Sequence, residues 1–269
     1  MAVKLSIIIP CYQSEATLPE TLASVLAQDF ESWEALIVND GSPDGVAAIA
    51  SEWVAKDARF RYFEKPNGGL GSARNFGLER ALGHYILPLD SDNKVRPNFA
   101  RKALKILEQD SAIGVVYGDA EYFGEKTGIW KVGEFSRYKM LSHNYIDACA
   151  IIRKQIFDEL GLYDEAMPHQ GHEDWDFWLR VIAANHSFFY LEEVTFDYRV
   201  LASSMIRSFD KEMTLRNIDY IFKKHYKLYG TSFVELKKKH DRLVKEFNIP
   251  IFTKIKRRLI KGLRNKGSN

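Results

Sequence analysis

The sequence predicts an α/β fold in which helices cover both faces of a mostly parallel central sheet. Over roughly the first 120 residues, short apolar runs rich in β-branched residues alternate with longer segments whose apolar residues recur every three or four positions. This alternation is typical of parallel strands joined by crossover helices. A length of 269 residues, 46% of them hydrophobic and 28% charged, fits either one large α/β domain or one domain with a tail, and excludes a disordered or fibrous chain.

The elements of the first part are expected in alternating order. The strands are the apolar runs at residues 5–9, 35–38, 60–63, 85–89 and 115–117. The helices between them are expected at residues 17–27, 46–56, 72–82 and 97–109. Ser72 and Asn98 stand where the helix starts need capping side chains.

The later part of the chain is mixed up to residue 200 and helical beyond residue 210. Residues 122–135 are expected to form a hairpin or loop, and residues 148–152 and 188–191 to form strands. A helix is expected from Asp174 to Ala184. The last part is helical and Lys-rich, and Pro250 interrupts it.

Polar loops follow the first four expected strands. They are Tyr12-Gln13 and residues 39–42, 65–69 and 90–93. In open α/β sheets, ligands bind beyond the carboxyl ends of the strands, where such loops converge. The sequence therefore predicts a binding site at this edge of the sheet.

Three carboxylates in these loops are candidate ligand contacts. Asp90 and Asp92, separated by Ser91, supply the hard oxygen atoms that Mg²⁺ or Mn²⁺ prefers, and such a cation would offset the charge of a diphosphate. Asp40 can accept the imide proton of a uracil base. Turns in which Asp side chains cap backbone amides explain the same residues.

Two further motifs have a functional and a simpler interpretation. The Gly-rich residues 67–75 open a helix whose amides, with Arg74, can meet phosphate or ribose, but a glycine turn beside a surface arginine explains them equally well. Glu173 and Asp174 begin a helix beside Trp175. A carboxylate against aromatic rings has a raised pKa and is a better proton acceptor. Acidic capping of the helix dipole and a core tryptophan are the alternatives.

Five segments taken together resemble the inverting glycosyltransferases of family 2. In order, they are residues 5–12 (LSIIIPCY), 36–44 (LIVNDGSPD), 67–77 (NGGLGSARNFG), 85–93 (YILPLDSDN) and 172–178 (HEDWDFW). The resemblance covers roughly residues 3–205. It implies the GT-A (Rossmann-like) fold, a nucleotide-diphosphate sugar donor and a divalent cation, Mn²⁺ or Mg²⁺.

The resemblance assigns seven residues to the donor: Pro10, Tyr12, Asp40, Asn67, Arg74, Asp90 and Ser91. Pro10 and Tyr12 would line the base pocket. Asp40 would contact the uracil ring, and Asp90 the ribose. Arg74 matches a family arginine whose contact varies.

The resemblance also implies the chemistry. Asp92, the last Asp of the Asp-x-Asp motif, would be the metal ligand. Asp174 would deprotonate an acceptor hydroxyl, which attacks the anomeric carbon with inversion, and Glu173 and Trp175 are acceptor-side candidates. Many members carry a further Asp where this chain has Asn93. A family element near the donor phosphates is matched loosely by residues 203–207 (SSMIR).

The implied function is transfer of a sugar from a UDP-hexose or UDP-N-acetylhexosamine to an acceptor in glycan or polysaccharide biosynthesis. The acceptor would be a glycan, or be linked to lipid or protein, and no nucleic acid partner is expected. Residues 1–209 would form the catalytic domain, with a nucleotide-binding half over about 1–119 and an acceptor-binding half over 120–209. Residues 210–269 would be a helical, Lys/Arg-rich extension.

Two other functions remain open at this point. A non-catalytic module that binds sugar nucleotides is one, although such a module has no need of both Asp92 and Asp174. A nucleotidyltransferase is the other. It would carry a Gly-rich loop with Arg or Lys after the first strand, and residues 11–14 (CYQS) are not such a loop.

The formal net charge of +2 conceals an asymmetry between the two parts of the chain. Residues 211–269 contain 17 Lys and Arg against 5 Asp and Glu, whereas residues 1–210 contain 21 against 31. Residues 251–264 have no acidic residue and are typical of a basic helix on an anionic membrane; a solvated tail, or one docked on the acidic part, is the alternative.

No apolar run is long enough for a signal peptide or a membrane span. We therefore expect a cytoplasmic protein that is either cytosolic or peripheral on the cytoplasmic face of a membrane. Cys11 and Cys149 are expected to be free, buried thiols.

Overall fold

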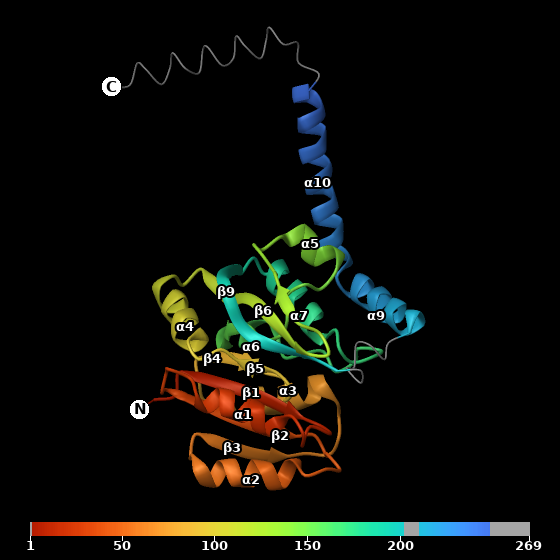
Figure 1. Cartoon of the computed structure of the whole chain (residues 1–269). Helices are drawn as coiled ribbons and strands as arrows, with labels where there is room; N and C mark the ends of the chain where they lie inside the picture. Colours follow the sequence, from red (N-terminus) through yellow and green to blue (C-terminus); the bar gives the residue numbers. More distant parts are fainter. Residues whose placement is uncertain (1, 202–209, 248–269) are drawn as a thin grey trace, which may run out of the picture. The chain divides into compact units, whose positions relative to one another are not determined.

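The computed structural model confirms the α/β prediction (Figure 1). It describes residues 2–201 and 210–247. The chain divides into two compact units, Met1–Lys224 and His225–Asn269. Residues 203–207 and 251–264, for which the sequence predicts a phosphate element and membrane contact, lie outside the described residues.

Within the described residues, one sheet contains nine strands in the order β3-β2-β1-β4-β8-β6-β9-β5, with β7 paired to β6. The strands are β1 (Leu5–Cys11), β2 (Trp33–Asn39), β3 (Phe60–Glu64), β4 (Tyr85–Pro88), β5 (Lys94–Val95), β6 (Ile113–Gly124), β7 (Gly128–Trp130), β8 (Ile151–Arg153) and β9 (Ser187–Val200). Strand β1 is parallel to β2 and β4, β2 is parallel to β3, and β6 is parallel to β9. The short strands β5, β7 and β8 pair in antiparallel fashion.

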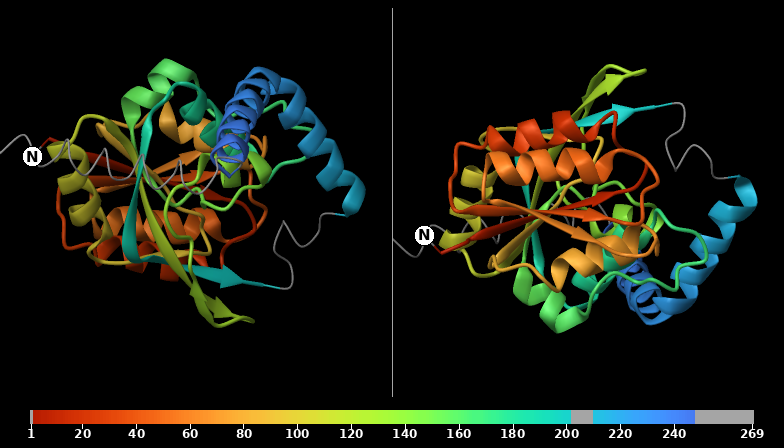
Figure 2. Two further views of the ribbon diagram at one scale, coloured as in Figure 1. Left: turned by 90° about the horizontal axis from the view of Figure 1, so that it is seen from above. Right: turned by 90° about the horizontal axis from the view of Figure 1, so that it is seen from below.

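Helices lie on both sides of this sheet (Figure 2). The helices that the structure describes in the first unit are α1 (Leu18–Leu26), α2 (Val46–Lys56), α3 (Leu70–Leu78), α4 (Phe99–Gln109), α5 (Arg137–Ser142), α6 (Lys154–Leu160), α7 (Glu173–Ala183) and α9 (Lys211–Lys224). Helix α10 (Tyr226–Phe247) belongs to the second unit. Buried side chains of α1, α2 and α4 form one apolar core with Ile7 and Ile9 of β1. Ile8 points to the other face, where α3 packs so closely that a Cβ at Gly77 would lie 2.5 Å from Ile8 Cγ2. Glycine at this position therefore permits the close approach of helix and strand.

The structure corrects several predicted boundaries. Strands β6 and β9 extend over 12 and 14 residues, well beyond the predicted 115–117 and 188–191. Aromatic residues pair across the two strands, as in Tyr122 with Tyr198, whose ring centroids are 5.9 Å apart. Of the two predicted caps, Asn98 is at the N-cap position of α4, and Ser72 is not a cap. Gly69, not Ser72, is the N-cap of α3, and Asn98 precedes α4 without a side-chain hydrogen bond.

Two expectations about membrane spans and cysteines can be compared with the described residues. Among these residues, no helix combines the length and the apolar character needed to cross a bilayer. Cys11 and Cys149 are free and buried, which confirms the prediction.

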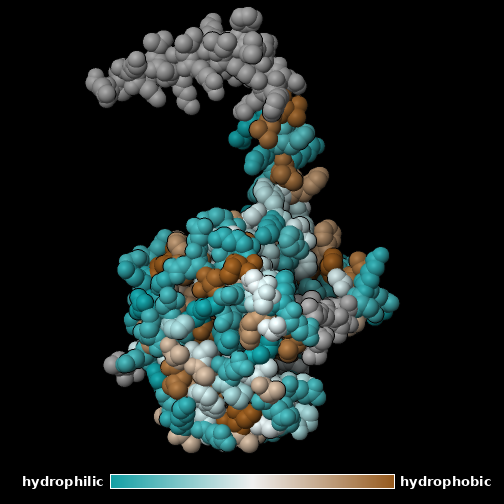
Figure 3. Space-filling model, in the orientation of Figure 1, coloured by the Kyte–Doolittle hydropathy of each residue, from teal (hydrophilic) through white to brown (hydrophobic). Residues whose placement is uncertain are grey.

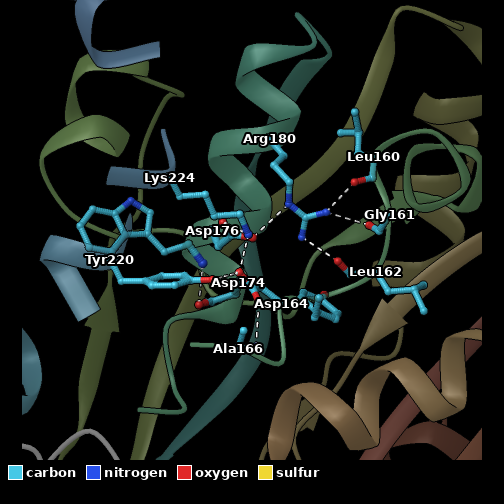
Figure 4. A network of polar contacts seen from close by, with 12 residues as sticks. Leu160, Gly161, Leu162, Asp164, Ala166, Asp174, Asp176, Arg180, Tyr220 and Lys224 are labelled. Atoms are coloured by element: carbon cyan, nitrogen blue, oxygen red, sulfur yellow. Dashed lines mark hydrogen bonds and ion pairs between the residues drawn. The ribbon is translucent and has the colours of Figure 1, made fainter. Parts of the chain in front are cut away.

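Helix α7, which begins with the acidic cluster, is anchored by a buried carboxylate (Figure 4). Asp176 is fully buried, and its two oxygen atoms accept from Arg180 Nε at 3.0 Å and from Lys224 Nζ at 2.8 Å. Arg180 also donates to three backbone carbonyls at the end of α6 and in the loop after it, and Lys224 Nζ contacts Asp164 of this loop at 2.5 Å. Helices α7 and α9 and this loop are thus joined by one charged network within the first unit.

Helix α10 belongs to the second unit and is amphipathic. It exposes Tyr226 and five aliphatic or phenyl side chains, Phe233, Val234, Leu236, Leu243 and Val244, whose exposed fractions are 68, 49, 48, 47 and 43%. The space-filling view shows brown apolar groups among teal hydrophilic ones on this helix (Figure 3). Its basic residues are Lys227, Lys237, Lys238, Lys239, Arg242 and Lys245.

Replacing Lys224 by Met tests the network at Asp176. The variant leaves one oxygen of a buried carboxylate without its cation, and we expect the free energy of unfolding to fall by about 1–3 kcal/mol. Urea denaturation followed by circular dichroism measures this change. Lys223→Met is the matched control, because Lys223 pairs with Asp219 on the exposed side of the same helix and should contribute less than about 0.5 kcal/mol. Equal effects in the two variants would contradict an anchoring role for Lys224.

Candidate active site

A cavity of about 470 Å³ opens where the parallel strands end. This volume is within the range of small-molecule sites. The structure brings ten of the predicted residues together in its lining: Pro10, Tyr12, Asp40, Asn67, Arg74, Asp90, Ser91, Asp92, Glu173 and Asp174. Trp175 lies outside this lining, is 4% exposed, and donates its indole N–H to Met140 O at 2.8 Å.

Asp40 organises the Gly-rich loop at one end of the cavity. Its carboxylate accepts hydrogen bonds from Lys65 Nζ at 2.6 Å, Gly68 N at 3.0 Å and Gly69 N at 2.7 Å. Gly69 has φ of +89°, a conformation that favours glycine. An ionised carboxylate offers about four lone-pair sites. Asp40 therefore retains capacity for one more donor, such as the imide N–H of a base.

Arg74 joins the two acidic ends of the cavity. Its guanidinium is 2% exposed and lies between Asp90 Oδ1, 2.6 Å from Nη2, and Glu173 Oε1, 2.5 Å from Nη1. Burial alone lowers the pKa of Arg74, but the charges of Asp90 and Glu173 outweigh burial and raise it above the usual value. The arginine is therefore always charged, and it connects the loop after β4 to the start of α7.

Three aspartates concentrate negative charge on the wall of the same cavity. They are Asp90, Asp92 and Asp147. Burial and the neighbouring Asp90 raise the pKa of Asp92 to about 6, and the same two causes raise that of Asp147 to about 7. A cation placed here would stabilise the ionised forms.

The donor atoms present fit a hard divalent cation. The fold family implies such an ion, and Mg²⁺ usually binds one or two protein carboxylates while substrate phosphates and waters complete its coordination. Within residues 2–201 and 210–247, no three His, Cys, Asp or Glu side chains gather in a metal-binding cluster. Asp92 and the neighbouring Asp90 are suited to supply these one or two carboxylate ligands, with substrate phosphates and waters supplying the others.

Asn93 stabilises the loop that carries these aspartates. Its side-chain Oδ1 accepts the backbone N–H of Arg199 on β9 at 2.9 Å, and its side chain is 2% exposed. Arg199 in turn donates to the backbone oxygen of Asp92 at 2.9 Å. An Asp at this position would offer the same acceptor atom, so the departure from the family pattern leaves this contact intact.

Asp174 lies at the other end of the cavity, at the start of α7. Its Oδ1 accepts from Trp175 N at 2.8 Å and its Oδ2 from Asn144 Nδ2 at 2.8 Å. Burial and the negative charge of Glu173 raise its pKa to about 8. A carboxylate of this kind is suited to accept a proton near neutral pH.

Sequence reasoning did not single out four residues that shape the site: Lys65, Asn144, Asp147 and Tyr198. Asp147 and Tyr198 line the cavity, and Lys65 and Asn144 each hold one of the predicted carboxylates. Lys65 follows the third strand in a predicted polar loop, and this position could have identified it as a site residue. The others lie in segments without a motif.

Solved structures share this fold at low sequence identity. Staphylococcus aureus TarS in complex with UDP-GlcNAc matches with a TM-score of 0.66 and 20% identity, over 77% of this chain and 62% of that chain. The mannosyltransferase PcManGT of Pyrobaculum calidifontis, in complex with GDP-Man and Mn²⁺, matches with a TM-score of 0.64 and 16% identity, over 84% and 65%. The fold is that of the GT-A glycosyltransferases.

Sequence comparison identifies the family within this class. The profile of glycosyl transferase family 2 matches residues 6–161. An uncharacterized glycosyltransferase of Rickettsia typhi is 31% identical over 224 residues, which are 79% of this chain and 67% of that protein. The chain belongs to glycosyl transferase family 2. It matches 34% of the length of an uncharacterized glycosyltransferase of Rickettsia felis, so some relatives are much longer.

Proposed function

We propose that this protein transfers a sugar from a UDP-sugar to an acceptor hydroxyl with inversion, in glycan or polysaccharide biosynthesis. The observation that carries the proposal is a single cavity lined by both the aspartate pair and a carboxylate with a raised pKa, Asp174. A module that only binds sugar nucleotides has no use for such a base. TarS, a structural neighbour bound to UDP-GlcNAc, supports a UDP-sugar donor, a UDP-hexose or UDP-N-acetylhexosamine.

The donor is proposed to lie along the strand ends. Tyr12 is 49% exposed in the cavity wall and offers a ring face to the base, beside Pro10 and Asn67. Asp40 accepts the base N–H with its remaining lone pair, and Asp90 and Ser91 face the ribose. The diphosphate then extends toward Asp92 and Asp174, where its negative charge needs compensation.

The chemical step is proposed to be one in-line displacement. Asp174 takes the proton of the acceptor hydroxyl while that oxygen forms a bond to the anomeric carbon. The bond from the anomeric carbon to the diphosphate oxygen breaks, and the nucleoside diphosphate leaves with its electron pair. Asp92 would hold a divalent cation, Mn²⁺ or Mg²⁺, which would supply charge stabilisation to that leaving group. PcManGT, bound to Mn²⁺, supports this use of a metal.

The domain boundaries predicted from the sequence remain part of the proposal. Residues 1–209 would act as the catalytic domain, with donor contacts mainly in residues 1–119 and acceptor contacts in residues 120–209. Glu173 and Trp175 stay acceptor-side candidates, although Glu173 is bonded to Arg74 and Trp175 is buried outside the cavity lining. Residues 210–269 would be the helical extension.

Asp174→Asn tests the catalytic proposal. The amide cannot accept the proton, so we expect turnover to fall by roughly two to four decades, while UDP binding is retained because the proposed contacts to the base, the ribose and the metal are made by other residues. Release of UDP from a panel of UDP-sugars with Mn²⁺ and candidate acceptors measures turnover. Calorimetric titration with UDP measures binding. Normal turnover in this variant would refute a base role for Asp174.

Asp92→Ala tests the metal proposal. Without this carboxylate, we expect Mn²⁺ to lose most of its effect on UDP affinity, since the cation links protein and diphosphate. UDP is titrated into the wild type and the variant, each with Mn²⁺ and with EDTA. Ser91→Ala is a neighbouring control that leaves both carboxylates in place. If Mn²⁺ strengthens UDP binding equally in Asp92→Ala and the wild type, Asp92 is not the ligand.

We also propose that the basic end of the chain, including residues 251–264, contacts the cytoplasmic face of a membrane. Helix α10 supports this proposal because it combines exposed apolar and basic side chains. Each Lys or Arg near an anionic surface contributes about 1 kcal/mol. Co-sedimentation with anionic and with neutral vesicles compares the full chain with one ending at Asn248. We expect weaker binding to anionic vesicles by the shorter chain, and equal binding would reject a role for residues 251–264.

A further inference from the structure

We infer that Asn144 is a positioning residue that holds the carboxylate of Asp174 in the orientation needed for proton abstraction. The inference rests on the proposed role of Asp174 as the base. It concerns a residue in a segment to which no motif of the sequence assigns a function. Its support is the contact itself, the anchoring of the segment that carries Asn144, and the charges around Asp174.

Two different groups hold the two oxygen atoms of Asp174. Oδ2 accepts from Asn144 Nδ2 at 2.8 Å, and Oδ1 accepts from Trp175 N at 2.8 Å. The backbone N–H of Trp175 alone leaves the carboxylate free to rotate about its own bond. The second contact, from a side chain 30 positions away, restricts that rotation. The remaining lone pairs are the ones available to a hydroxyl in the cavity.

The segment that carries Asn144 is tied to the helix that carries Asp174. Trp175 Nε1 donates to Met140 O at 2.8 Å, and Trp178 Nε1 donates to Ile146 O at 3.0 Å. Both tryptophans are on α7, and the two carbonyls flank Asn144 along the chain. The distance between amide and carboxylate is therefore fixed by contacts within one packed body, as a preorganised site requires.

In the part of the chain that the structure describes, the side-chain oxygen of Asn144 makes no hydrogen bond that would compete with the contact between its amide N–H and Asp174. This atom, Oδ1, is buried and has no hydrogen-bond partner among the residues that the structure describes. The orientation of the amide is therefore determined by its contact with Asp174. A donor that faces an ionised carboxylate stabilises the charged form, which is the form that accepts a proton.

The other groups that face Asp174 act in opposing directions. Glu173, on the same helix, and Asp147, in the loop before β8, disfavour its charge, and Arg74 of α3 favours it. Tyr163, in the loop after α6, is also close enough to interact electrostatically. The hydrogen bond from Asn144 adds to the effect of Arg74 and lowers the pKa of Asp174. Its removal is therefore expected to raise that pKa further.

A titration without any ligand tests this inference directly. The full-length protein is labelled with aspartate carrying carbon-13 in the side-chain carboxyl group, and the Asp174 signal is assigned by its absence in Asp174→Asn. In the wild type, titration in the presence of EDTA reports the midpoint of this carboxyl group. We expect Asn144→Ala to move the midpoint upward by about one pH unit, the size expected for loss of a hydrogen bond to a charged group.

His143→Ala is the matched control. His143 is exposed and bonds the hydroxyl of its neighbour Ser142, so its removal perturbs the same segment without touching Asp174. We expect no shift of the Asp174 midpoint in this variant. A midpoint that is unchanged in Asn144→Ala, or shifted equally in His143→Ala, would overturn the inference.

Kinetics separate this inference from the proposed function. With a UDP-sugar that the wild type turns over, we expect Asn144→Ala to lower kcat about tenfold or more and to leave the KM for the donor within about twofold, because the contact serves the chemical step. If Asp174→Asn is inactive while Asn144→Ala has wild-type kcat, only the role of Asn144 fails. If Asp174→Asn is fully active, the proposed base and the inference fail together.

Discussion

The site depends on one buried ion network, in which Arg74 lies between Asp90 and Glu173. Arg74 and Glu173 are buried and Asp90 is partly exposed, and burying such charges is costly unless each has a partner. Here the partners come from three parts of the chain: the loop after β4, helix α3 and the start of α7. The arginine therefore fixes the separation between the aspartate pair of one loop and Asp174, which directly follows Glu173. Displacing helix α3, which carries Arg74, would leave the buried carboxylate of Glu173 without its cation.

The same arrangement gives neighbouring carboxylates different properties. The carboxylate of Glu173 forms an ion pair with Arg74 and accepts a hydrogen bond from the backbone N–H of Gly171. Asp174 has a neutral amide and one backbone N–H as its hydrogen-bond partners, and the charge of Glu173 beside it raises its pKa. Adjacent residues on one helix are thereby divided between a structural ion pair and a group able to exchange a proton near neutral pH.

The sequence predicts the parts of this site that follow from local patterns. Asp40, Asp90 and Asp92 come directly after apolar runs, and parallel strands necessarily bring such positions to one edge. Lys65 also lies in one of these loops, but its contact with Asp40, 25 positions away, could not be derived from the local pattern. Asn144 lies in a segment without a motif, and its role arises from a contact with a residue 30 positions away. The full lengths of β6 and β9 could not be predicted either, because polar residues interrupt their apolar pattern. Only the pairing of the two strands explains their extent.

The two indole hydrogen bonds of α7 have a consequence for variation in this family. Trp175 and Trp178 donate to the main-chain oxygens of Met140 and Ile146, not to their side chains. Main-chain oxygens are present whatever amino acid occupies a position. The exposed residues of this segment, such as His143, can therefore be exchanged while the segment keeps its place beside α7. The surface of this segment can therefore vary in sequence, by evolution or by engineering, with little effect on the geometry of the site.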